Sequence, residues 1–243
     1  MAAVLLALLG QGSASLAGDP PECLAAQELL GTDFPLPHVA QAISAKRLDV
    51  LVLGAGSSTL PGANGAANAY PARLQKALAA RLPGVVVKVT ADVKARRTAD
   101  EMVKVLPAAL AAAKPALLVW QTGTVDAMQA VDTDQFSMAL EQGIQIARRA
   151  GADAILVNAQ YSPRTESMIA LGTYEEDLRW VAVQQEVPLF DRFAIMKSWS
   201  DSGTFDLYSA TKKLDMAERV HDCIGRLLAV LVIRSGQAAE PPK

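Results

Sequence analysis

Hydroxyl side chains directly follow a short apolar run in the first quarter of the chain. The run covers residues 48–53, and the turn after it reads Gly54, Ala55, Gly56, Ser57, Ser58 and Thr59. A short continuous apolar run is typical of a buried parallel strand, and open α/β sheets place their ligand sites at the carboxyl ends of such strands. A serine there can act as a nucleophile if a base takes its proton and hydrogen-bond donors stabilise the oxyanion. Ser57 is therefore the first candidate for chemistry, with Ser58 as the alternative.

Two other interpretations of this turn stay open. Gly54 and Gly56 supply the first two glycines of the dinucleotide-binding pattern G-x-G-x-x-G, but Thr59 stands at its third glycine. That pattern also expects an acidic residue about 20 positions further on, and the first candidate, Asp92, comes too late. The other interpretation is a tight turn without chemistry.

The rest of the chain supplies the elements that would position this turn. We expect strands at 50–54, 85–90, 116–121, 154–158 and 187–190, and helices at 70–81, 98–113, 134–150, 174–185 and 214–233. Thr98 and Glu101 form a capping box at the start of one helix. The alternation of apolar strands and helices predicts an α/β fold, a three-layer α/β/α sandwich with a five-stranded parallel sheet and residues 50–54 at its centre. The polar loops after the strands should then converge on one edge.

Four strings in these loops and helix starts resemble the SGNH (GDSL-type) hydrolases, and most closely a bacterial subgroup of them. The strings are Gly56-Ser57-Ser58-Thr59, Tyr70-Pro71-Ala72-Arg73-Leu74, Thr98-Ala99-Asp100-Glu101-Met102 and Trp120-Gln121-Thr122-Gly123-Thr124-Val125-Asp126-Ala127. The resemblance extends over about residues 48–233. It implies the flavodoxin-like SGNH hydrolase fold and ester chemistry at a serine, and it places Ser57 at the family's nucleophile.

The resemblance also assigns the oxyanion side of the cleft, where the chain departs from the family. Arg96 stands at the family's second-block glycine, and Val125 stands at the asparagine of the third block, between Gly123 and Asp126. A valine side chain cannot donate a hydrogen bond, and loss of one oxyanion donor costs about a hundredfold to a thousandfold in rate. We expect Asp126 to have a structural role, such as capping the following helix.

The general base can be assigned in two ways. With Cys223 aligned to a helix cysteine of the subgroup, the family's D-x-x-H block falls on Lys212 and Asp215. The alternative base is His221, which follows Glu218 by three residues. Two hypotheses result: an ester hydrolase or acyltransferase acting on carbohydrate or lipid esters through Ser57 and His221, or a catalytically degenerate protein that binds a glycan or protein partner in the same cleft. We expect ester hydrolysis to be weak or absent.

Composition limits the other functions. The formal net charge of −2 gives no sign of the positively charged surface that binds nucleic acid. The chain has two histidines and two cysteines, none at metal-ligand spacing, so we expect neither a metal nor another cofactor. No segment is expected to span a membrane, and the sequence leaves the oligomeric state open.

The amino-terminal residues suggest export. Residues 1–17 are interpreted as a truncated secretory signal that ends in Ser15-Leu16-Ala17; an uncleaved apolar tail is the alternative. One SGNH-like domain would follow at 18–234 and a disordered tail at 235–243, and the location would be periplasmic or secreted. In an exported chain the even cysteine count favours a disulfide between Cys23 and Cys223. Two unrelated buried thiols remain the other possibility.

Overall fold

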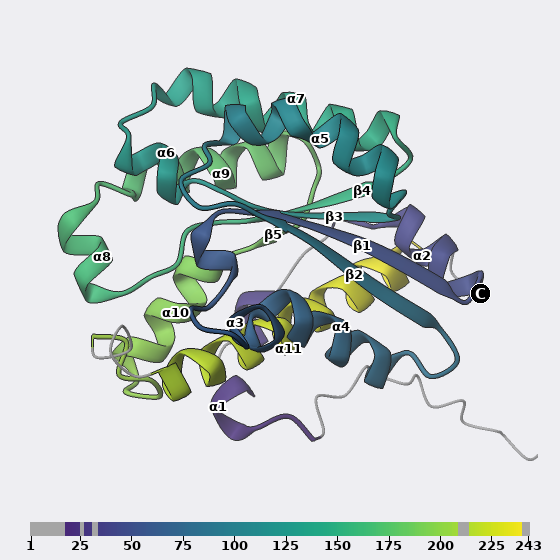
Figure 1. Cartoon of the computed structure of the whole chain (residues 1–243), viewed down its shortest axis with the longest axis horizontal. Coiled ribbons are helices and arrows are strands. Elements are labelled where there is room, and N and C mark those ends of the chain that lie inside the picture. The colour runs from purple at the N-terminus through teal and green to yellow at the C-terminus, as the bar shows by residue number, and fades with distance from the viewer. Residues whose placement is uncertain (1–17, 25–26, 31–33, 209–213, 240–243) are drawn as a thin grey trace, which may run out of the picture.

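Five strands form a single sheet in which all paired strands run parallel (Figure 1). The computed structural model describes residues 18–24, 27–30, 34–208 and 214–239. In spatial order the strands are β2 (Val86–Val93), β1 (Arg47–Gly54), β3 (Leu117–Gln121), β4 (Asp153–Val157) and β5 (Leu189–Phe190). The predicted five-stranded parallel sheet is confirmed. Its centre was predicted wrongly: β3 is the middle strand, and β1 lies second, between β2 and β3.

Helices cover both faces of this sheet and complete the predicted three layers (Figure 1). One face carries α5 (Ala99–Ala113), α7 (Thr133–Arg149) and α9 (Gly172–Gln184). The other carries α2 (Pro37–Ser44), α4 (Tyr70–Arg81) and α11 (Leu214–Ala238). The shorter elements are α1 (Pro21–Leu24), η1 (Gln27–Leu30), η2 (Gly56–Ser58), α3 (Gly65–Asn68), α6 (Thr124–Met128), α8 (Pro163–Met168) and α10 (Arg192–Asp201).

The alternation of side chains along the strands divides the core into two apolar clusters. On β3, Leu118 and Trp120 belong to the cluster under α5, α7 and α9, whereas Leu117 and Val119 belong to the cluster under α4 and α11. This is the period of two that a strand buried on both faces requires. Because both faces are covered, the strand ends are left as the place where polar side chains can gather.

Helices α4 and α11 approach each other closely. A Cβ atom at Gly225 of α11 would come within 2.6 Å of the Cβ of Arg73 and 2.8 Å of its backbone carbonyl carbon. Only glycine fits there without displacing α4. This contact fixes α11 relative to α4, which places His221 beside the start of α4.

The carboxyl-terminal tail was predicted wrongly in part. Residues 235–238, expected to be disordered, continue α11, and Ser235 and Gly236 are buried. The reason is α2, a helix that was not predicted from the sequence: the Ser235 carbonyl accepts a hydrogen bond from the Leu36 amide, just before α2, at 2.9 Å. The proposed signal segment 1–17 and residues 240–243 lie outside the described residues.

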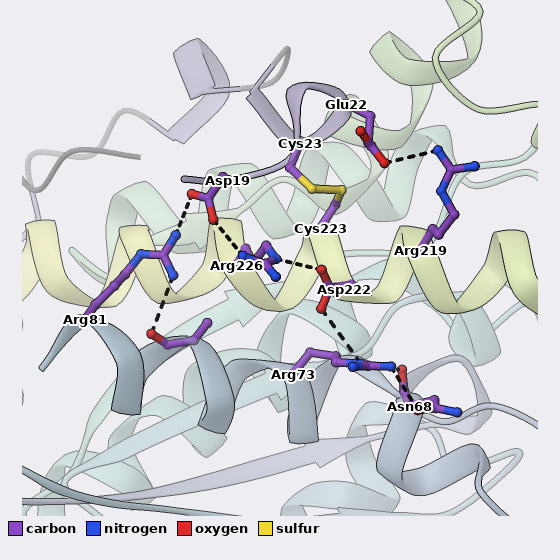
Figure 2. A network of polar contacts seen from close by, with 11 residues as sticks. Asp19, Glu22, Cys23, Asn68, Arg73, Arg81, Arg219, Asp222, Cys223 and Arg226 are labelled. Carbon is purple, nitrogen blue, oxygen red and sulfur yellow. Dashed lines mark hydrogen bonds and ion pairs between the residues drawn. A yellow bond between two sulfur atoms is a disulfide. The ribbon is translucent and has the colours of Figure 1, made fainter. Parts of the chain in front are cut away.

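The amino-terminal segment is fastened to α11 by a disulfide and by ion pairs (Figure 2). Cys23 of α1 is joined to Cys223 of α11 with 5.0 Å between their Cα atoms, so the predicted disulfide is confirmed. Close by, the buried Asp19 carboxylate pairs with Arg81 of α4 and Arg226 of α11. The amino-terminal segment, which has no apolar core of its own, is therefore held against α4 and α11.

Loss of the disulfide should lower the stability of the fold. In a variant with both Cys23→Ser and Cys223→Ser, we expect the free energy of unfolding to fall by about 2–4 kcal/mol, because the unfolded chain regains the entropy of an open loop. Denaturant unfolding measures this. Dithiothreitol should shift the unmodified protein by the same amount and leave the double variant unchanged. Equal midpoints for both proteins without reductant would contradict the prediction.

Candidate functional site

Ser57 lies in η2, directly after β1, and opens into a pocket at the carboxyl ends of the strands. The pocket has a volume of about 430 Å³. It is lined by Gly56, Ser57, Thr59, Leu60, Pro61, Gln160, Tyr161, Ser162, Thr165, Arg192, Met196, Leu207, Leu214, Ala217, Val220 and His221. Ser57 is half-buried, whereas Ser58 is buried behind it. Of the two candidate serines, Ser57 is thus the one that a ligand can reach.

The side-chain oxygen of Gln121, at the end of β3, organises this turn. It accepts hydrogen bonds from the Ala55 amide at 3.2 Å, the Ser57 hydroxyl at 3.2 Å and the Ser58 hydroxyl at 2.8 Å. A backbone N–H can only donate, so the Ala55 contact fixes which end of the Gln121 amide faces the turn. The Ser57 proton therefore points at an amide oxygen, which is not a base.

Arg192, the first residue of α10, lies on the other side of Ser57. Its side chain is fully buried. Nη1 donates to the Ser57 oxygen at 3.4 Å, and Nη2 donates to Oε1 of Gln160 at 3.3 Å. The guanidinium carbon also lies 5.7 Å from the centre of the Tyr70 ring. Burial lowers the pKa of Arg192 to about 10, so the guanidinium stays protonated at neutral pH and brings a positive charge to the Ser57 oxygen.

His221 lines the same pocket, but its ring is already engaged. Its Nδ1 accepts a hydrogen bond from the Tyr70 amide at 3.0 Å. That amide is the first donor of α4 and has no partner within the helix, so His221 caps the helix. Since Nδ1 is the acceptor, the proton of the neutral ring lies on Nε2. Burial first, and then the charges of Arg192 and Arg73, lower the pKa of His221 to about 3.

These contacts disfavour His221 as a general base. With its proton on Nε2, the ring can donate toward the pocket and cannot take a proton there. The described part of the chain shows no hydrogen bond between Ser57 and His221. Glu218, which precedes His221 by three residues, accepts a hydrogen bond from Asn68 at 2.8 Å rather than orienting the histidine. Asp215, at the family's histidine position, is exposed in the first turn of α11, and Lys212 lies outside the described residues.

Of the proposed oxyanion residues, Arg96 lies on the loop after β2, Gly123 precedes α6, and Val125 and Asp126 lie in α6. None of them lines the pocket as the structure describes it. Arg96 is exposed and has φ of +63°, a left-handed conformation in keeping with a position where the family has glycine. Gly123 also has positive φ, +97°. Val125 is half-buried against the apolar cluster under α5, α7 and α9.

Asp126 is buried and joins two helix starts. Its Oδ1 accepts a hydrogen bond from the Ala99 amide of α5 at 2.8 Å. Its Oδ2 accepts from the Thr122 hydroxyl at 3.2 Å and from the Gly123 amide, at the cap of α6, at 3.3 Å. Burial raises the pKa of Asp126, and these hydrogen bonds oppose the rise. The contacts fit a structural role, and include the helix cap that we expected.

Glu175 of α9 supports the loop that carries Gln160 and Tyr161 into the pocket. Its Oε1 accepts a hydrogen bond from the Ala159 amide at 3.1 Å, while Oε2 is buried with no hydrogen-bond partner among the described residues. Burial is the main reason that the pKa of Glu175 rises from 4.5 to about 8. The carboxyl is therefore mostly protonated at neutral pH, so the loop after β4 is hydrogen-bonded to a neutral carboxylic acid.

Neither Arg192 nor Glu175 was predicted as a site residue from the sequence, and Gln121 was placed only at a strand end and in the string that resembles the family. Arg192 follows a short strand, and nothing in its local pattern marks it as buried. Within the described residues, no group of histidine, cysteine and acidic side chains could hold a metal ion. In the same part of the chain, no helix combines the length and apolar character needed to cross a membrane.

Comparison with known proteins identifies a matching family and solved structures with a similar fold. A model of the Non-GDSL lipase-like family matches residues 22–238. None of the curated proteins compared with the chain matches it. A catalytic mutant of Axe2, an acetylxylan esterase from Geobacillus stearothermophilus, matches with a TM-score of 0.60 and 16% identity over 76% of this chain and 94% of that one. The structure of TesA matches with 26% identity and a TM-score of 0.49, over 58% of this chain and 76% of that one.

Proposed function

Because the chain belongs to the Non-GDSL lipase-like family and has the SGNH hydrolase fold, we propose that its Ser57 pocket binds a small-molecule or glycan ester and hydrolyses it slowly or not at all. The observation that carries this proposal is the proton arrangement around Ser57. The serine proton is held by the Gln121 amide oxygen, and the nearby His221 presents a protonated Nε2. Nucleophilic attack by a serine needs a base in contact with its hydroxyl, and the described residues that line this pocket offer none.

A working hydrolase is the second candidate, and one observation favours it. Arg192 donates to the Ser57 oxygen, so a positive charge lies where negative charge would develop during attack on an ester. This positive charge could replace part of the oxyanion stabilisation that is lost because Val125 stands where the family has a hydrogen-bond donor. The acetylxylan esterase fold match and the family assignment favour ester ligands under either candidate.

Hydrolysis of p-nitrophenyl acetate and butyrate tests the two candidates. We expect the purified chain to exceed the Ser57→Ala variant by no more than a few-fold, because losing the base and an oxyanion donor together removes most of the rate. The matched variants are Ser58→Ala, at the neighbouring serine, and His221→Ala. A high rate that disappears in both Ser57→Ala and His221→Ala, but survives in Ser58→Ala, would establish the hydrolase.

We also propose that the protein works in the periplasm or outside the cell. The support is the disulfide between Cys23 and Cys223, since such bonds persist in oxidising compartments. The signal segment at 1–17 remains a prediction. Mass spectrometry of protein exported by its native host would give the mature amino terminus, and a start close to residue 18 is the expected result.

A further inference from the structure

Arg192 carries a buried positive charge that no described carboxylate neutralises. Its two hydrogen bonds go to neutral oxygens, those of Ser57 and Gln160, and both are long. The third nitrogen of the guanidinium, Nε, is buried and has no hydrogen-bond partner in the described part of the chain. A buried charge is normally paired, because removing it from water is costly. The unmet partner of this guanidinium must then come from outside the described chain.

The place for that partner is the Ser57 pocket. Arg192 is one of its lining residues, and Ser57 and Gln160, which hold the guanidinium only weakly, line it too. A carboxylate accepts two hydrogen bonds from a guanidinium with better geometry than a hydroxyl and an amide at 3.3–3.4 Å. An entering anion can therefore take over these donors while the two displaced side chains remain in contact with it.

The other lining residues indicate what kind of molecule bears the anion. A largely apolar wall is formed by Leu60, Pro61, Met196, Leu207, Leu214 and Val220. Among the described residues that line the pocket, Arg192 is the only arginine or lysine. One cation balances a single negative charge, which favours a carboxylate over a doubly charged phosphate.

We propose that the ligand of this pocket carries a singly charged carboxylate on an apolar chain and that Arg192 selects for it. The inference rests on the proposed function and narrows it: the preferred ester is one with a free carboxylate, such as a half-ester of a dicarboxylic acid. Arg192 binds the carboxylate, the apolar wall packs against the chain, and a neutral ester of the same shape binds more weakly.

Calorimetric titration of the full chain with monomethyl adipate and dimethyl adipate tests the selection. The two probes share an ester and a chain and differ in the free carboxylate. We expect the half-ester to bind at least about tenfold more tightly, since hydrogen bonds to a charged group exceed those to a neutral one by that margin. Equal affinities would overturn the inference and leave the proposed ester binding intact, whereas absence of binding by both would overturn the two together.

Three variants and two further probes complete the experiment. Arg192→Gln should lose the preference for monomethyl adipate, while Arg164→Gln, which removes an exposed arginine from the neighbouring α8, should keep it. If Arg192→Gln does not fold, Arg192→Lys keeps the charge without the planar fork and should show a reduced preference. Hexyl phosphate binding more tightly than hexanoate to the unmodified protein would overturn the assignment to a carboxylate.

Discussion

Glu175→Gln should stay stable at pH 9, where the unmodified protein is expected to lose up to about 5 kcal/mol of unfolding free energy relative to acid. The carboxyl of Glu175 is buried, and its pKa rises from 4.5 in an ordinary environment to about 8 in the fold. Between these values the folded chain keeps a proton that the unfolded chain has released. The stability from this group is therefore complete below pH 4.5 and is lost as the pH rises through 8.

Unfolding by urea at several pH values from 4.5 to 9 measures this effect. Glutamine has the shape of the protonated acid and can accept the same hydrogen bond from Ala159, so the variant should lack the alkaline loss. The matched control is Glu176→Gln, which changes the exposed neighbour on the same helix and should follow the unmodified protein. A difference between Glu175→Gln and the unmodified protein that does not grow with pH would rule the prediction out.

His221 should make the free energy of unfolding fall as the pH is lowered, which is the opposite of the effect of Glu175. Its pKa falls from 6.5 to about 3 in the fold, because burial and two arginines disfavour the charged ring. Here the unfolded chain binds the proton first. The stability from His221 is complete above pH 6.5 and is lost as the pH falls toward 3, with a loss of about 4 kcal/mol by pH 3.5.

Two substitutions separate the proton from the helix cap. His221→Gln keeps an acceptor for the Tyr70 amide and should remove most of the acid loss between pH 6.5 and 3.5. His221→Leu also removes the proton but leaves that buried amide unpaired, which costs about 1–3 kcal/mol at every pH. In the unmodified protein, the ring protons of His221 should not titrate in NMR spectra above pH 4. A titration midpoint near 6.5 would disprove the arrangement.

The strands and the long helices were predictable because their signals are local. Helix α4 begins and ends at the predicted residues, since Pro71 suits a helix start and Pro83-Gly84 follows its end. The start of α5 was predicted from Thr98, and the structure shows the capping box. The apolar runs gave the strands to within a few residues, and the sheet edge that receives their polar loops followed from their parallel direction.

The site was harder to predict because its main determinants depend on distant contacts. Arginine is usually exposed, so only the packing of α10 against the strand ends reveals that Arg192 is buried beside Ser57. The nitrogen of His221 that carries the proton depends on the Tyr70 amide, 151 residues away in the sequence. Spacing within one segment cannot encode either fact. Helix α10, which was not predicted, does have a local signal, because the Asp191 side chain accepts a hydrogen bond from the Ala194 amide at its start. The helix that follows β5 is short, however.

The disulfide has a consequence for how the chain is made. Its two cysteines are separated by 200 residues, so Cys23 leaves the ribosome as a free thiol, and the whole sheet is synthesised before Cys223 exists. Because the chain has only these two cysteines, no wrong bond can form within one molecule. The competing product is a bond between two nascent or newly released chains. Premature oxidation would therefore yield covalent dimers rather than scrambled monomers, and the yield of native protein should depend on how dilute the newly made chains are.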